Sequence, residues 1–249
     1  MNIFVVMKTV ENNWFKSWFN TRYYHILYKN RNDEEAQFFI KNLTEKLHFS
    51  KKQLILDLAC GKGRHAIYLN KLGYHVIGAD LSENNIAEAK KYENDRLQFF
   101  VHDMRKPLQN NYHVILNLFT SFGFFEVDNE HILVLKNIKE ALKTNGFAVI
   151  DFMNTNTVID NLIAYEEKTV DNITFKISRY IKDEFIVKEI NFNSDNEDHT
   201  YFERIKILPF QKIKMFLKKA GLNIKYSFGD YSLNDFDSNT SERLILIVT

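Results

Sequence analysis

An acidic residue followed by a glycine turn ends the first strongly apolar segment of the chain, and this combination suits the binding of a nucleotide. The apolar run at residues 54–58 contains Asp57 and leads into a tight turn with Gly61 and Gly63. A dinucleotide-binding turn would have a third glycine, so that a pyrophosphate can lie on the N-terminus of the following helix. This chain instead has D-x-A-x-G-x-G. The acid-first turn therefore favours a ligand that carries an ammonium group and a ribose but no phosphate.

Polar residues also follow the next three predicted strands, at the point where each strand ends. Asp80 and Asp103 follow the second and third apolar runs, and Asn117 follows the fourth. The carboxyl ends of parallel strands meet at one edge of an open α/β sheet, and ligands bind at that edge. A single acidic residue at a strand end is more often a helix cap or a turn residue. The joint order and spacing of these three residues predict a ligand site.

These motifs resemble those of the class I S-adenosylmethionine-dependent methyltransferases. The resemblance implies S-adenosylmethionine as cofactor and S-adenosylhomocysteine as product. It implies that Asp57 and the backbone of residues 61–63 hold the methionine end, and that Asp80 holds both ribose hydroxyls. Asp103 would accept a hydrogen bond from the adenine amino group, and Met104 would pack on the ring. The cofactor-binding residues that the resemblance implies are Tyr24, Arg31, Asp57, Ala59, Gly61, Gly63, Arg64, Asp80, Leu81, Asp103, Met104, Asn117 and Leu118.

The glycine turn departs from the commonest form of the family at one position. Ala59 stands where a glycine is frequent, and alanine is tolerated there if it keeps a negative φ. Cys60 lies in the same turn. We interpret Cys60 as a small packing residue and not as a nucleophile, because free cysteine usually behaves as a small hydrophobe.

The fold class expected is α/β, with a Rossmann-like, seven-stranded, mostly parallel sheet that contains one antiparallel strand, plus a small antiparallel three-stranded cap. Strands alternate with helices as far as residue 152, which indicates βαβ units. Three alternating runs joined by short polar turns then indicate an antiparallel meander. The meander resembles the cap sheet that small bacterial members of the family insert after strand five. The predicted organisation is N-terminal helices covering the cofactor site at 1–50, a methyltransferase core at 51–171 and 209–249, and a β-meander cap at 172–208.

Length and composition fit one enzyme-sized domain with an appendage. The chain has 249 residues, of which 45% are hydrophobic, and this is enough to bury a large core. A net charge of +1 gives no strong field toward nucleic acid or an anionic membrane. The single cysteine and the short apolar run at 3–7, too short for a signal-peptide core, predict a cytoplasmic protein. We expect no metal site, and Met7 is as good a candidate start as Met1.

Two clusters are candidates for contact with a methyl acceptor. Residues 23–28 are rich in aromatic side chains and include His25, a candidate general base. The alternative is an aromatic helix face that packs on the core. The second cluster follows the fourth strand, where Phe119, Phe122 and Phe124 are expected to form apolar pocket walls.

Charged residues interrupt the apolar alternation of the predicted meander. Arg179 and Arg204 would favour a carboxylate-bearing acceptor if they face the pocket. The other interpretation is that these arginines are solvated or form ion pairs at the surface. We extend it to Glu203 and to Arg243 on the last strand.

The predicted function is methyl transfer to a small-molecule acceptor by in-line displacement, in a protein that is a monomer or a homodimer. Two alternatives stay open: transfer of an aminopropyl group on the same fold, and a cofactor-binding subunit without turnover. Residues 117–120 read Asn-Leu-Phe-Thr, whereas family members that methylate DNA or protein amides carry Asn/Asp-Pro-Pro-aromatic here. This departure argues against a nucleic-acid substrate.

Overall fold

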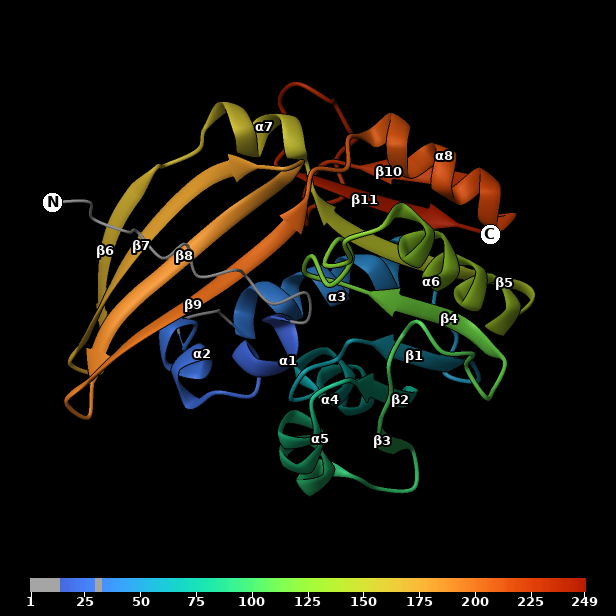
Figure 1. The fold of residues 1–249 in the computed structure, drawn as a ribbon. Coiled ribbons are helices and arrows are strands. Elements are labelled where there is room, and N and C mark those ends of the chain that lie inside the picture. Colours follow the sequence, from blue (N-terminus) through green and yellow to red (C-terminus); the bar gives the residue numbers. More distant parts are fainter. Residues whose placement is uncertain (1–13, 30–32) are drawn as a thin grey trace, which may run out of the picture.

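The computed structural model describes residues 14–29 and 33–249, and these form two sheets with helices around them (Figure 1). The larger sheet has seven strands in the order β10-β11-β5-β4-β1-β2-β3. Its strand β11 runs antiparallel to both neighbours, and the β1, β2, β3, β4 and β5 pairings are parallel. The predicted α/β fold class is confirmed. The strands of this sheet are β1 (Leu54–Leu58), β2 (His75–Asp80), β3 (Leu97–Val101), β4 (Tyr112–Asn117), β5 (Leu142–Met153), β10 (Ile224–Phe228) and β11 (Arg243–Val248).

Helices cover both faces of this sheet, which explains why its central strands are continuously apolar. Successive residues of β1 point to opposite faces, so Ile55 packs with α3, α4 and α5, whereas Leu56 packs with α6 and α8. Ser82 caps α5 by accepting the N–H of Asn85, and Gly221 ends α8 at a φ of 75°. The helices are α1 (Trp14–Trp18), α2 (Arg22–Leu27), α3 (Asp33–Lys46), α4 (Arg64–Lys71), α5 (Glu83–Ala89), α6 (Asp128–Ala141), α7 (Thr155–Asp160) and α8 (Phe210–Ala220), with a short 3₁₀ turn at Lys90–Tyr92. Within the described part of the chain, no helix is long and apolar enough to cross a membrane.

The second sheet, here called the cap sheet, is an antiparallel meander of four strands in the order β6-β7-β8-β9. Its inner face packs on α1 and α2, which lie on its concave side beside the larger sheet (Figure 1). Buried side chains of β7 and β8, including Phe175 and Ile190, meet Trp18 and Leu27 there. The strands are β6 (Tyr165–Val170), β7 (Ile173–Lys182), β8 (Phe185–Ser194) and β9 (Glu197–Lys206).

The cap sheet has one strand more than the sequence pattern predicted. The additional strand β6 reads Tyr-Glu-Glu-Lys-Thr-Val, and none of its residues is buried. It is an edge strand that pairs only with β7 among the described residues. Because an edge strand of this kind buries little apolar surface, its sequence lacks the alternation that marked the other three.

Candidate active site

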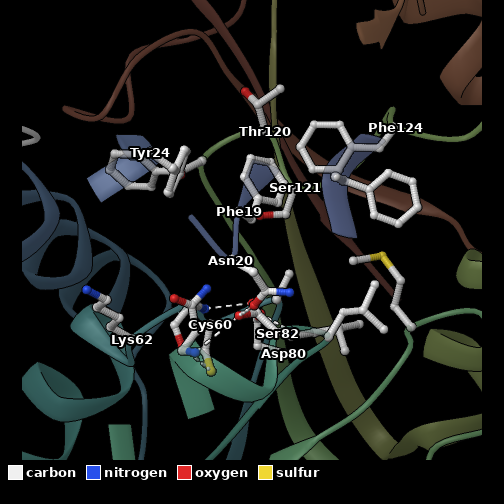
Figure 2. A pocket seen from close by; sticks show the side chains of 18 of the residues that line it. Phe19, Asn20, Tyr24, Cys60, Lys62, Asp80, Ser82, Thr120, Ser121 and Phe124 are labelled. Carbon is white, nitrogen blue, oxygen red and sulfur yellow. Dashed lines mark hydrogen bonds between the residues drawn. The ribbon is translucent and has the colours of Figure 1, made fainter. Parts of the chain in front are cut away.

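A cavity of about 900 Å³ lies between the carboxyl ends of the larger sheet's strands, the N-terminal helices and the cap sheet. Its volume is at the upper end of the range for small-molecule sites. The polar side of its wall comes from the turns after β1, β2 and β3, and the aromatic side comes from α1, α2 and the loop after β4. Figure 2 shows Asp80 and Ser82 on one side, and Phe19 and Phe124 across from them. The predicted strand-end site is therefore one continuous space.

In the turn after β1, every second residue from 59 to 63 has a left-handed backbone conformation. Ala59, Gly61 and Gly63 have φ values of 65°, 55° and 82°. Ala59 therefore does not meet the condition of a negative φ under which alanine would be tolerated in this turn without strain. The N–H groups of Ala59 and Cys60 both donate to the carbonyl of Ala79, at 2.7 and 3.0 Å, and hold the turn against β2. For a residue with a Cβ this conformation costs about 1–2 kcal/mol, and such strain concentrates at functional sites.

Close packing against Phe99 on β3 also fixes the conformation of this turn. A Cβ on Gly63 would lie 2.7 Å from the ring of Phe99 on β3, closer than real contacts allow. Cys60 is buried, and burial raises the pKa of its thiol well above the usual value. The thiol form is thereby favoured, in agreement with a packing role for this residue.

Asp80 ends β2 and faces the cavity with both carboxylate oxygens already oriented. Its Oδ2 accepts the N–H of Gly61 at 2.8 Å, and its Oδ1 accepts the N–H of Ser82 at 2.9 Å (Figure 2). Burial raises the pKa of Asp80. The Asn85 side chain also hydrogen-bonds this carboxylate. Of the four carboxylate lone pairs three are then used, and the remaining acceptor capacity suits a ligand hydroxyl in the cavity.

Asp103 and Met104 follow β3 and also line the cavity. Arg105 binds the Asp103 carboxylate through two side-chain nitrogens, with Nη2 at 2.7 Å, and its backbone N–H donates to the same carboxylate. Arg105 also pairs with Glu130 on α6 and lies over the ring of Phe125. The loop after β3 is thus fixed by a network that holds Asp103 at the cavity wall.

Asp57 and Asn117 are predicted site residues that are buried behind the cavity wall and do not line it. Asp57 is 1% exposed, and burial raises its pKa to about 7. It accepts a hydrogen bond from the N–H of Ala66, so it orients the start of α4. Asn117 donates from Nδ2 to the carbonyl of Leu58 at 3.0 Å, which ties the end of β4 to the end of β1.

Glu203, on β9, extends the cavity wall from the cap sheet. It is 8% exposed, so its interpretation as a surface-paired residue is wrong. Its Oε1 accepts from Trp18 Nε1 at 2.8 Å and from the Tyr28 hydroxyl at 2.6 Å. Lys188 lies 3.0 Å from Oε2 and also donates to the Tyr28 hydroxyl. A carboxylate held this way presents a fixed orientation to the cavity.

The comparisons with known proteins agree with this geometry. A methyltransferase domain model matches residues 55–146, which contain β1 to β4 and the turns described above. The chain is 35% identical over 101 residues to a probable S-adenosyl-L-methionine-dependent methyltransferase, TehB, of Haemophilus influenzae; the match covers 39% of this chain and 34% of that protein. It is 25% identical over 209 residues to the putative methyltransferase YqeM of Bacillus subtilis, covering 78% of this chain and 83% of the relative. This chain thus spans about a third of the length of the TehB proteins that it matches.

Residues 55–146 of this chain thus form a methyltransferase domain. Two solved structures share the fold of the chain over nearly their whole length. A methyltransferase from Clostridium acetobutylicum superposes with a TM-score of 0.76 at 17% identity, covering 91% of this chain and 95% of that one. CalS10 of Micromonospora echinaspora, an amino pentose methyltransferase solved with S-adenosylmethionine bound, gives 0.70 at 16% identity, covering 92% and 97%. S-adenosylmethionine is the cofactor of this family.

Most of the predicted cofactor residues fall on one wall of the cavity. The described cofactor candidates that line the cavity are Tyr24, Ala59, Gly61, Arg64, Asp80, Leu81, Asp103, Met104 and Leu118. Gly63 lies just behind that wall, as do Asp57 and Asn117. Arg31 lies outside the described residues, as do Met1 and Met7. The described residues contain no group of His, Cys, Asp and Glu arranged to bind a metal ion.

The predicted acceptor residues divide between the cavity and other surroundings. His25, Phe119 and Phe124 line the cavity, whereas Phe122 is 1% exposed and packs against the core. Burial lowers the pKa of the His25 imidazole, Lys62 lowers it further, and Asn85 hydrogen-bonds the ring.

The two arginines of the cap sheet do not line the cavity. Arg179 aligns with Lys188, which aligns with Glu203, so these three residues share one face of the sheet. Arg179 pairs with Glu166 on the neighbouring strand. Arg204 follows Glu203, so it points to the opposite face, where it pairs with Glu126. Both arginines are neutralised within the protein, which removes the basis for a carboxylate-bearing acceptor.

Proposed function

We propose that this chain transfers a methyl group from S-adenosylmethionine to a small molecule bound under the cap sheet. The observation that carries the proposal is the continuity of the cavity. Its polar wall contains Asp80 and Asp103, and its aromatic wall contains Phe19, Tyr24 and Phe124. A site that joins a nucleoside-binding edge to a partly enclosed aromatic space can hold two reactants side by side.

The residues of the polar wall fit the cofactor. The Asp80 carboxylate lines the cavity and keeps acceptor capacity for the ribose, and the glycine turn offers closely approachable backbone for the methionine end. Three donors from Arg105 fix the orientation of the Asp103 carboxylate at the cavity wall, where the family resemblance places the adenine amino group. Met104 lies beside it for packing on the ring.

The chemistry supported by this site is an in-line displacement. The cofactor supplies a methyl group on a sulfonium centre, so alignment in a dry pocket is the main task of the protein. The acceptor's lone pair forms a bond to the methyl carbon while the carbon–sulfur bond breaks and its electrons stay on sulfur. A protonated acceptor must also lose a proton. His25 is the candidate base, because burial and Lys62 favour its neutral form.

An amine is the acceptor class that we favour among small molecules. The aromatic wall suits a positively charged amine, which is attracted to aromatic faces. Glu203 adds oriented oxygen acceptors for its N–H groups, although Lys188 balances the charge of this carboxylate. Several proteins of similar fold or sequence act on amines by their names, among them the sugar N-methyltransferase KedS8 and the glycine/sarcosine N-methyltransferase of Aphanothece halophytica. The alternatives of aminopropyl transfer and of a subunit without turnover have no such support.

The test is a screen for S-adenosylhomocysteine release with the purified chain and S-adenosylmethionine. The panel pairs each amine with the alcohol of the same carbon skeleton. We expect release with one or more amines and none with the matched alcohols. Turnover with alcohols alone would overturn the amine assignment. Binding of S-adenosylmethionine without turnover on any compound of a broad panel would favour the non-catalytic subunit.

A further inference from the structure

Two consecutive residues in the cavity wall have a backbone conformation that side chains disfavour. Phe119 and Thr120 follow β4 with φ values of 55° and 61°. Both line the cavity. Left-handed conformations are uncommon for residues other than glycine, and they persist where the surroundings force them. A Thr is particularly unfavourable there because its side chain branches at Cβ.

A network centred on Asp151 holds these two residues in place. The carboxylate lies on β5 and is 0% exposed. Its Oδ2 accepts the N–H of Phe119 at 2.7 Å, and the Asp151 carbonyl accepts the N–H of Thr120 at 3.0 Å. Arg243 on β11 donates to Oδ1 from Nε and Nη2, at 2.9 and 2.7 Å. The same Nη2 donates to the Thr120 hydroxyl at 2.9 Å. Three strand ends thereby converge on one turn.

This turn places the Phe119 ring against the start of α4. The ring centroid lies 4.9 Å from that of His65 and 5.1 Å from that of Tyr231, and the Arg64 guanidinium lies 4.7 Å above the ring. Arg64 and His65 directly follow the glycine turn. The Tyr231 hydroxyl donates to Asp151 at 3.3 Å, which closes the network. The position of the Phe119 ring is therefore coupled to the part of the wall that we assign to the methionine end of the cofactor.

We propose that Asp151 and Arg243 are positioning residues that hold Phe119 and Thr120 in the left-handed conformation and so shape the cofactor end of the cavity. Neither residue lines the cavity. The effect on cofactor binding rests on the proposed function, whereas the effect on the turn does not. A purely structural ion pair between β5 and β11 would change stability without changing the turn or the affinity for cofactor.

The test uses four variants and two measurements. Arg243→Met removes the bridging donor, and Thr120→Val removes only the hydroxyl that Arg243 binds. Ser121→Ala is the control, since Ser121 lines the same cavity but its hydroxyl donates to the Leu118 carbonyl. Arg243→Met combined with Thr120→Gly tests rescue, because glycine adopts positive φ readily. The measurements are amide hydrogen exchange of residues 118–121 without ligand, and S-adenosylhomocysteine affinity by calorimetry.

We expect faster exchange at residues 119 and 120 in Arg243→Met and Thr120→Val, and affinities roughly two- to tenfold weaker, as for loss of one hydrogen bond. Ser121→Ala should keep the slow exchange at those residues. The loss of S-adenosylhomocysteine affinity caused by Arg243→Met should be smaller when residue 120 is glycine. Unchanged exchange and affinity in a folded Arg243→Met protein would overturn the proposal. If that variant does not fold, the same two readouts on Thr120→Val decide.

The two arms separate this inference from the proposed function. Wild-type protein that binds no S-adenosylhomocysteine would contradict the cofactor assignment. The exchange measurement would still decide whether Arg243 holds the turn. Conversely, normal cofactor binding in all four variants, with unchanged exchange, would remove the positioning role and leave the proposed function intact.

Discussion

Replacement of Asp80 by alanine should weaken cofactor binding strongly while leaving the fold in place. The carboxylate accepts the N–H groups of Gly61 and Ser82 and a hydrogen bond from the Asn85 side chain, and its remaining acceptor capacity is assigned to the ribose. Alanine leaves the ribose without this protein acceptor in a partly desolvated site. A loss of this kind costs on the order of 2–3 kcal/mol, or roughly 30- to 150-fold in affinity.

Asp80→Ala should reduce the free energy of unfolding less than it reduces the free energy of cofactor binding. Burial raises the pKa of Asp80, so the charged form of this carboxylate costs more free energy in the folded protein than in the unfolded chain. Removal of the carboxylate relieves that penalty and partly offsets the loss of two backbone hydrogen bonds. Calorimetric titration with S-adenosylhomocysteine measures the affinity, and urea unfolding measures the stability.

The matched control is Asp95→Ala. Asp95 is exposed and lies between the 3₁₀ turn and β3, away from the cavity. Its replacement should leave affinity within the error of the titration. Equal affinities for the Asp80 and Asp95 variants, with both folded, would refute the ribose-binding role and reduce Asp80 to a residue that orders the neighbouring turns.

Three further predictions test the site and its supports. Burial raises the pKa of Asp57 from 3.8 to about 7, so the stability linked to its protonated form is present below pH 4 and is lost as the pH rises toward 7. Asp57→Asn should flatten this decline in the free energy of unfolding between pH 4 and 7, measured by urea unfolding, and a pH dependence parallel to that of the wild type would contradict the assignment. Gly63→Ala should lower the free energy of unfolding by about 1–3 kcal/mol more than Gly221→Ala does. Both glycines have positive φ, but only a Cβ at residue 63 would clash with Phe99. Equal thermal stabilities of the two variants would disprove this steric argument. Glu203→Gln should raise the KM for an amine acceptor without changing S-adenosylhomocysteine affinity, and an unchanged KM would remove Glu203 from acceptor recognition.

The cofactor edge was predictable from sequence because it depends on short segments. An apolar run that ends in an acid marks a strand and its carboxyl end together, so Asp80 and Asp103 could be placed before any fold was known. The same logic misplaced Asp57 slightly, since a residue one position before the strand's end points into the core. Sequence also gave no sign that Ala59 adopts positive φ, because the Ala79 carbonyl that holds the turn belongs to another strand.

The acceptor side was harder to predict because it is assembled from segments far apart in the chain. Glu203 and Arg204 are adjacent in sequence, yet strand register sends one to the cavity and the other to the opposite face. One residue of register decides which face each takes. The Asp151–Arg243 pair likewise exists only because β11 returns beside β5. Sequence patterns predict where the strands lie, but they do not predict which strands pair or in which register.

Cofactor choice is the central claim, and a side-by-side calorimetric titration tests it most directly. The purified chain is titrated with S-adenosylhomocysteine and, separately, with NAD under the same conditions. We predict micromolar-range binding of S-adenosylhomocysteine and no measurable binding of NAD, because the acid-first turn has no third glycine for a pyrophosphate. Tight binding of NAD with no response to S-adenosylhomocysteine would contradict the account.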